Sequence, residues 1–231
     1  MNRHQSCGFT LLEILIALAI VALVFTSLFA VFDKVMDVAG HVEQRKNVVQ
    51  TGRLVLMRLN ADLGSLLQPE ENEQKTADPL NATAEGSWKA FRGESLPESG
   101  LDAFANATVL SFATSSGLEF NSTWPGHSLY RVTYIIEPVE QGEERYRLLR
   151  RQTQFPYLDA AQMESLELCR NLSELEIQFH TGDETLPQLS WNTDAYAEEE
   201  QPIPAAVAIR FTLQDESGSE RFSLFKTLES F

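Results

Sequence analysis

One carboxylate, that of Glu13, lies in an apolar segment where its charge needs an oppositely charged or hydrogen-bonding partner. Glu13 is the only charged residue in the apolar run 9–32. A lone carboxylate inside a bilayer costs several kcal/mol unless an opposite charge or a hydrogen-bond donor reaches it. The sequence therefore predicts ion-pairing chemistry at Glu13, with a partner group that lies at the same depth in the membrane.

The apolar run itself is long enough to cross a membrane. Its 24 residues would form a helix of roughly 36 Å, at about 1.5 Å per residue, against a hydrocarbon core of about 30 Å. A polar leader that carries Arg3 precedes the run. A secretory signal would have a shorter apolar core with a small-x-small cleavage site behind it, whereas Ala17-Leu18-Ala19 lies inside the run. The basic leader predicts that the N-terminus stays in the cytoplasm and that the remainder is translocated.

The junction between leader and apolar run reads Gly8-Phe9-Thr10-Leu11-Leu12-Glu13. This segment resembles the type IV prepilin signature, with glycine before the scissile bond, phenylalanine after it and glutamate at the fifth mature position. The resemblance implies cleavage by a prepilin peptidase between Gly8 and Phe9, N-methylation of the new Phe9 amine, and retention of the apolar helix. In a bundle of such helices, Glu13 could pair with the Phe9 amine of a neighbouring subunit in one register only. An ordinary signal anchor with an incidental glutamate is the alternative.

A helical pattern continues beyond the apolar run. Apolar residues recur at alternating steps of three and four over 35–66, and no proline interrupts them. This spacing predicts an amphipathic helix that prolongs the membrane helix to about Leu67. Charged residues, Arg58 and Asp62 among them, are assigned mostly to its polar face. A coiled-coil dimer seam is the alternative, but a glycine and an arginine in the stripe favour a helix that packs on its own domain.

The pattern changes twice after this helix. Residues 68–106 contain few aliphatic side chains and many acidic residues, glycines and prolines, which predicts a long connector. From Ala107 onward apolar residues alternate with polar ones, and turns such as Gln141-Gly142-Glu143 separate the runs, which predicts an antiparallel sheet with one solvated face. The predicted strands lie at 110–112, 130–136, 145–151, 172–179, 207–213 and 221–228.

These segments predict an α+β, pilin-like fold, in which a long N-terminal helix packs on a C-terminal antiparallel β domain. The predicted parts are a prepilin leader (1–8), a transmembrane helix (9–32), a periplasmic part of the N-terminal helix (33–67), an acidic connector (68–106) and the β domain (107–231). About 125 residues in the last part suffice for one domain and are too few for two.

The order of the strand segments narrows the resemblance. Leu129-Tyr130-Arg131-Val132-Thr133-Tyr134 is followed by 146–151, 172–179, Trp191 and 204–209. This series is similar to the J-type minor pseudopilin of the type II secretion system. The resemblance implies a structural component at or near the tip of the periplasmic pseudopilus, which helps to export folded proteins. It implies as partners the I and K types of minor pseudopilin, the prepilin peptidase and secreted proteins. The long connector and an acidic insert at 198–200 depart from the family pattern.

Composition excludes one class of partner. The formal net charge is −15, and loss of Arg3 with the leader would make it −16. Nucleic-acid binding depends on Lys and Arg that neutralise phosphates, so no nucleic-acid partner is expected. The simplest interpretation of the acidic excess is a solvated periplasmic surface. A more specific interpretation is that an acidic run such as 198–200 docks on a basic partner.

No catalytic motif is present in the sequence, so we expect a protein that is not an enzyme and that has no catalytic residue, cofactor or metal. Asp194 with Glu198-Glu199-Glu200 could supply oxygen ligands to Ca²⁺, although such acidic loops are usually only solvated. Cys169 would be the only cysteine left after cleavage, so it is predicted to be buried and without a disulfide. His180 is predicted to be a solvated strand residue.

Two other functions remain open from the sequence. A minor type IV pilin that initiates an external pilus would share the leader, the helix and the sheet. A prepilin-anchored periplasmic binding module would instead have a ligand pocket and would act without polymerisation. In each case the predicted location is the bacterial inner membrane, crossed once, with the C-terminal domain in the periplasm.

Overall fold

The computed structural model describes residues 10–67, 90–95, 107–118, 129–139, 145–154, 164–182, 186–193, 203–215 and 218–228. They belong to two compact units, Met1–Lys46 and Asn47–Phe231. Helix α1 (Leu11–Gly64) contributes to both. The second of these is called the sheet unit below.

The unit Met1–Lys46 consists, in its described residues, of the N-terminal part of α1. This helix is long and apolar enough to cross a membrane. The hydroxyls of Thr26 and Ser27 donate to the carbonyls of Ala22 and Leu23, at 2.8 and 2.9 Å. Both polar side chains are thereby satisfied within the helix, as a hydrocarbon environment requires.

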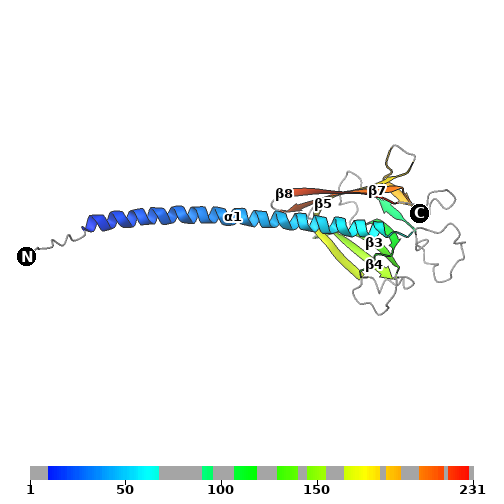
Figure 1. Cartoon of the computed structure of the whole chain (residues 1–231), viewed down its shortest axis with the longest axis horizontal. Helices are drawn as coiled ribbons and strands as arrows, with labels where there is room; N and C mark the ends of the chain where they lie inside the picture. The colour runs from blue at the N-terminus through cyan, green and yellow to red at the C-terminus, as the bar shows by residue number, and fades with distance from the viewer. Residues whose placement is uncertain are drawn as a thin grey trace, which may run out of the picture. The chain divides into compact units, whose positions relative to one another are not determined.

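The sheet unit contains one antiparallel sheet of eight strands (Figure 1). Their order across the sheet is β6-β1-β2-β3-β4-β5-β7-β8. The strands are β1 (Arg92–Glu94), β2 (Ala107–Thr114), β3 (Tyr130–Pro138), β4 (Tyr146–Gln154), β5 (Glu164–His180), β6 (Ser190–Asn192), β7 (Ala206–Asp215) and β8 (Gly218–Thr227). The predicted α+β, pilin-like fold class is confirmed, and each of the six predicted strands overlaps an observed strand.

Strands β1 and β6 were not predicted. The sequence analysis placed 92–94 inside the acidic connector, but in the structure β1 pairs with both β2 and β6. Three residues are too few to show an alternating pattern, and the middle residue of β1 is Gly93. A Cβ on Gly93 would lie 2.2 Å from the Phe179 ring, so the glycine lets the strand approach a buried aromatic side chain closely.

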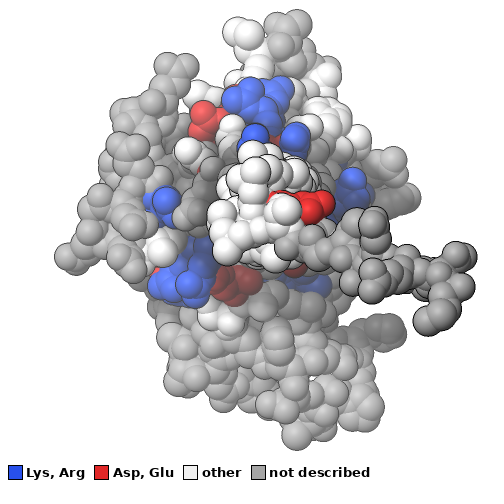
Figure 2. Space-filling view, turned by 90° about the vertical axis from the view of Figure 1, so that its left-hand side faces the viewer, with Lys and Arg blue, Asp and Glu red and all other residues white. Residues whose placement is uncertain are grey.

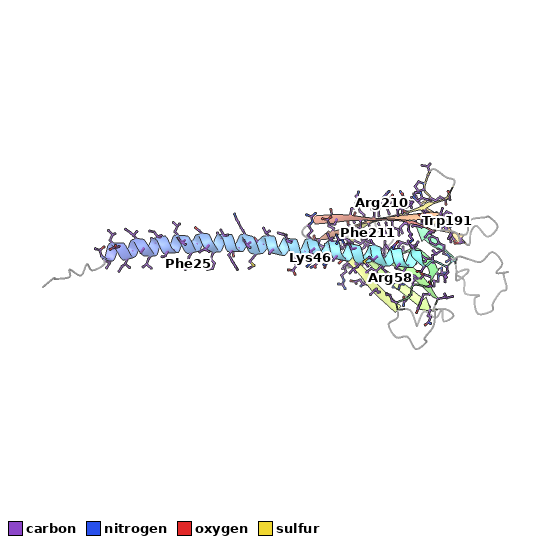
Figure 3. The ribbon with its side chains drawn as sticks, in the orientation of Figure 1. Phe25, Lys46, Arg58, Trp191, Arg210 and Phe211 are labelled. Carbon is purple, nitrogen blue, oxygen red and sulfur yellow. The ribbon has the colours of Figure 1, made fainter. Side chains whose placement is uncertain are left out.

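The core lies between the sheet and residues 48–63 of α1. The buried helix residues are Val48, Gly52, Val55, Leu59, Asp62 and Leu63. Alternation along the strands supplies the other half of the core: Arg210 is exposed, whereas Phe211 is buried and points toward α1 (Figure 3). The prediction that this helix packs on its own domain is confirmed. The assignment of Asp62 to the polar face was wrong, because its side chain is completely buried.

Strand β5 is bent so that it serves two neighbours. Its first half pairs with β4 and its second half with β7, with register shifts near Leu172. Asn171 lies at the change of partner with a φ of 40°, a left-handed conformation that asparagine tolerates better than most residues. The bend lets the sheet curl around α1.

Gly52 marks a close approach of α1 to the sheet, and Gly52→Ala is expected to destabilise the sheet unit by up to about 2 kcal/mol. A Cβ at this position would lie 2.1 Å from the Phe222 ring, and such overpacking costs about 1–3 kcal/mol, which outweighs the gain of about 1 kcal/mol in helix propensity. The measurement is urea unfolding of the full chain in detergent micelles. Gly64→Ala is the matched control, because there the added atom meets only the end of the Lys226 side chain. Equal effects of the two substitutions would contradict the close-packing argument.

Candidate functional site

Of the residues that carried the sequence prediction, the structure describes Glu13, which lies at the start of α1. Gly8 and Phe9 lie outside the described residues. Glu13 is exposed in the first turn of the helix, and its N–H donates to the carbonyl of Thr10 at 3.1 Å and to the Thr10 hydroxyl at 3.3 Å. Thr10-x-x-Glu13 has the spacing of a capping box, and a carboxylate in the first turn also complements the helix dipole. Glu13 therefore has a local role at the helix start besides the predicted role in assembly.

The surface of α1 around and beyond Glu13 is apolar and uncovered. Every large apolar side chain from Leu11 to Phe32 is between 48% and 78% exposed, and Figure 3 shows the side chains, including Phe25, projecting freely from the helix. Exposed apolar surface of this extent marks contact with lipid or with other apolar helices. This part of the chain can perform anchoring and helix packing.

A second polar site, which the sequence analysis missed, lies in the sheet unit around Asp62. The Arg150 guanidinium donates two hydrogen bonds to the Asp62 carboxylate, from Nε to Oδ2 at 2.6 Å and from Nη2 to Oδ1 at 3.2 Å. Both side chains are inaccessible to solvent. The Tyr134 hydroxyl donates to Oδ2 at 2.6 Å. A buried, bidentate pair of this kind fixes the rotation of α1 on strands β3 and β4.

A second arginine completes this group, which is called the Asp62 cluster below. Arg58, one turn earlier on α1, pairs with Asp62 and donates to the Ser116 carbonyl. Arg150 donates to the same carbonyl at 3.1 Å and to Gln152 Oε1 at 2.6 Å. Two guanidiniums thus share one carboxylate, and neutral acceptors from the β2 end and β4 take further donors, although Arg58 Nε is buried without a hydrogen-bond partner among the described residues.

The surroundings of Tyr134 keep its hydroxyl protonated. Burial, followed by the neighbouring Asp62 carboxylate, raises the pKa of Tyr134 well above its ordinary value. The phenol therefore remains a hydrogen-bond donor to Asp62 throughout the physiological pH range.

The end of α1 is also tied to β2 through the backbone. The Thr114 hydroxyl lies 3.0 Å from the carbonyls of both Asp62 and Ser65. The Leu67 N–H donates to the Ala113 carbonyl at 2.9 Å, and the Ser115 N–H to the Ser65 carbonyl at 3.0 Å. Carbonyls at a helix C-terminus need partners from outside the helix, and here the neighbouring strand provides them.

A signal for the Asp62 cluster was present in the sequence. Tyr146, Leu148, Arg150 and Gln152 alternate on one face of β4, and all four are buried. Arg150 therefore stands in a core-facing position and needs a buried anion. Asp62 follows Val55 and Leu59 at helical spacing, so the same reasoning would have found its partner.

The outer face of the sheet carries charged side chains that pair across strands. Glu137 accepts from Arg147 at 2.8 Å and from Arg151 at 2.6 Å. Glu174 accepts from the Thr212 hydroxyl, which lowers the pKa of Glu174. Such surface pairs contribute little stability, and they give the outer face of the sheet a mixed charge. Figure 2 shows the molecule from another direction, the left-hand side of Figure 1, where Lys and Arg side chains also lie next to Asp and Glu side chains.

The remaining candidates from the sequence are structural or lie outside the described residues. Cys169 is buried and free, and burial raises the pKa of its thiol to about 12, so it is protonated at neutral pH. His180 is half-buried and stacks edge-on against Phe225, with ring centres 5.5 Å apart. Asp194 and the acidic run 198–200 are not among the described residues. Within the part of the chain that the structure describes, no three His, Cys, Asp or Glu side chains gather as a metal site would require.

Comparison with known families matches the apolar helix and the sheet unit to two separate family models. The family model for type II secretion system protein J matches residues 30–225. The model for the prokaryotic N-terminal methylation motif matches residues 3–29, which include the Gly8-Phe9 junction and Glu13. Comparison with curated proteins gave no match. The methylation motif matches the exposed apolar helix, and the protein J model matches most of the chain, including the antiparallel sheet up to residue 225. The chain therefore belongs to the type II secretion system protein J family and is a minor pseudopilin of that system.

Proposed function

We propose that this minor pseudopilin acts at or near the tip of the periplasmic pseudopilus and helps to move folded proteins toward export. The observation that carries the proposal is the protein J match over 30–225, which includes most of α1 and all of the described sheet except the last two residues of β8. The family is anchored in the inner membrane and associates with other pseudopilins. A minor type IV pilin and an anchored binding module are not favoured by this match.

The proposed work of the chain is mechanical, and it involves no catalysis. The prepilin peptidase cuts between Gly8 and Phe9, and the Phe9 amine is methylated. The apolar part of α1 holds the chain in the inner membrane, with the sheet unit in the periplasm. During assembly α1 leaves the bilayer and joins a bundle of parallel helices, in which Glu13 pairs with the N-terminal amine of a neighbour and sets the register.

Two features of the sheet unit support a role as an assembly component. The Asp62 cluster fixes one orientation of α1 on the sheet, so that movement of the helix carries the sheet with it. The mixed charges of the outer face suit polar contacts with other proteins. The partners proposed are the I and K types of minor pseudopilin and, transiently, secreted proteins.

Mass spectrometry of the mature chain tests the processing that this function requires. Membranes from cells with the prepilin peptidase should contain a chain that begins at N-methyl-Phe9, and membranes from cells without it should contain the intact leader. In parallel, deletion of the chain should leave exoproteins in the periplasm. An intact Met1 in peptidase-positive cells, a cut beyond Ala30, or normal secretion after deletion would refute the proposal.

A further inference from the structure

The edge of the sheet formed by β8 is long and regular, and it is unpaired among the described strands. Strand β8 pairs with β7 over ten register positions without a shift, and it ends the strand order (Figure 1). No other described strand pairs with its far side. The opposite edge, β6, has only three residues. Of the usual protections of an edge, β8 has no proline, no bulge and no shortened strand, and only the charged side chains of Glu220, Arg221 and Lys226.

The backbone of β8 presents hydrogen-bonding groups to this free side at every second residue. Asp215 and Gly218 close a two-residue hairpin and face each other in the register. In such a hairpin the closing pair bond to each other, so the alternate residues of β8, Ser223 and Phe225 among them, turn their N–H and C=O groups away from β7. These groups form a template for one more antiparallel strand.

The side chains of β8 differ on its two faces. Phe222 and Leu224 are half-buried and pack against the core, with the Phe222 ring 5.2 Å from that of Phe211. On the outer face Phe225 is 64% exposed and Arg221 is 71% exposed. An added strand would need apolar residues beside Phe222 and Leu224. It would need no acidic residue for Arg221, since Arg221 already pairs with Glu174.

The direction of β8 restricts which chain can supply that strand. Within the sheet unit β8 runs in the same direction as α1, because Phe222 lies at Gly52 and the later Lys226 lies at Gly64. In the proposed fibre all subunits share one helix direction. A strand that pairs antiparallel to β8 therefore runs opposite to the common helix direction. If a neighbouring subunit supplies this strand, the strand must run opposite to that subunit's own helix.

A second copy of this chain does not meet this requirement. Antiparallel pairing of β8 with β8 would turn the two helices in opposite directions. The edge strand that runs opposite to α1 in this chain is β6, and its three residues cannot cover ten. We propose that β8 is the docking edge for a strand of a different pseudopilin, which extends the sheet antiparallel to β8. This inference rests on the proposed fibre and names the surface through which one partner binds.

Photo-crosslinking of the full chain in cells that make the whole secretion system tests the proposal. p-Benzoylphenylalanine replaces Phe225, an exchange of one aromatic side chain for another at an exposed edge position. We expect an adduct with the mass of this chain plus a different pseudopilin. The matched control carries the same probe at Ser165, which is exposed in the half of β5 that pairs with β4 and lies away from β8, and it should give about tenfold less of that adduct.

A proline substitution separates strand addition from simple side-chain contact. Ser223→Pro in the Phe225 probe chain removes an N–H that points away from β7, which an edge strand tolerates. It should lower the adduct about tenfold, whereas Ser223→Ala should leave the adduct unchanged. Chain levels and protease resistance serve as the check on folding.

Three results would overturn the docking edge: an adduct of twice the mass of this chain, equal yields at Phe225 and Ser165, or an adduct that Ser223→Pro leaves unchanged. If deletion of the chain still blocks secretion in the same cells, the proposed function stands and only the docking edge fails. If deletion has no effect on secretion, the proposed function itself fails.

Discussion

Asp62→Ala is expected to lower the free energy of unfolding of the sheet unit by about 3–5 kcal/mol, because it leaves a buried positive charge without its partner. Without the carboxylate, the Arg150 guanidinium stays inaccessible to solvent and loses both of its bonds to Asp62. The Tyr134 hydroxyl loses its acceptor at the same time. The side chain of Arg58 is 16% exposed and can turn toward water, so most of the cost falls on Arg150.

The measurement is urea unfolding of the full chain in detergent micelles, followed by tryptophan fluorescence, since Trp191 is buried in the sheet unit. Glu174→Ala is the matched control. It also removes a carboxylate that pairs with an arginine, but the two side chains are 63% and 71% exposed, and such a pair is worth about 0–1 kcal/mol. Similar losses for the two variants would show that burial of the Asp62 cluster does not matter.

A double substitution distinguishes the value of the pair from the cost of breaking it. Asp62→Leu together with Arg150→Met replaces the charges by apolar side chains of similar size, and this exchange is often nearly neutral in other proteins. We expect the double variant to recover more than half of the loss seen with Asp62→Ala. A loss as large as that of the single variant would mean that the pair itself supplies the stability.

The parts of the fold that were predictable are those with a regular apolar period. The alternation in Tyr130, Val132 and Tyr134 predicted β3, and all three side chains are buried. The paired strands β1 and β6 have three residues each, too short for any period, and their position depends on contacts with residues far away in the chain. The close approach of Gly93 to Phe179 is one such contact, and no local pattern encodes it.

The two polar sites differed in predictability for a physical reason. Glu13 can be recognised from the sequence because the residues around it in the run 9–32 carry no other charge. Asp62 is flanked by residues of mixed polarity and has ordinary helix spacing from Arg58. Its spacing from Val55 and Leu59 indicates burial only when it is combined with Arg150, which lies 88 residues later and faces inward. Such a pair is found by asking which core-facing charges need a partner, and not by scanning for motifs.

Glu13→Ala is expected to abolish incorporation of the chain into the fibre, with at least about a tenfold loss of secretion, which corresponds to 1.4 kcal/mol or more of lost pairing. The substitution removes a buried-charge cost in the bilayer, so membrane insertion should be preserved or improved. A failure to assemble would then report the lost ion pair and not a loss of anchoring. The measurements are the amount of chain in sheared pseudopili and the amount of exoprotein in the medium.

Glu13→Gln separates the two roles that the structure gives to this residue. Glutamine has nearly the same shape and serves as well as glutamate in a capping box with Thr10, but it cannot form an ion pair with an N-terminal amine. If register depends on the charge, the glutamine variant fails as the alanine variant does, although both chains reach the membrane in normal amounts. Normal secretion with glutamine would mean that Glu13 acts through the helix start alone. The predicted pairing with the neighbouring Phe9 amine would then be wrong, because a neutral amide would have replaced the charge without loss.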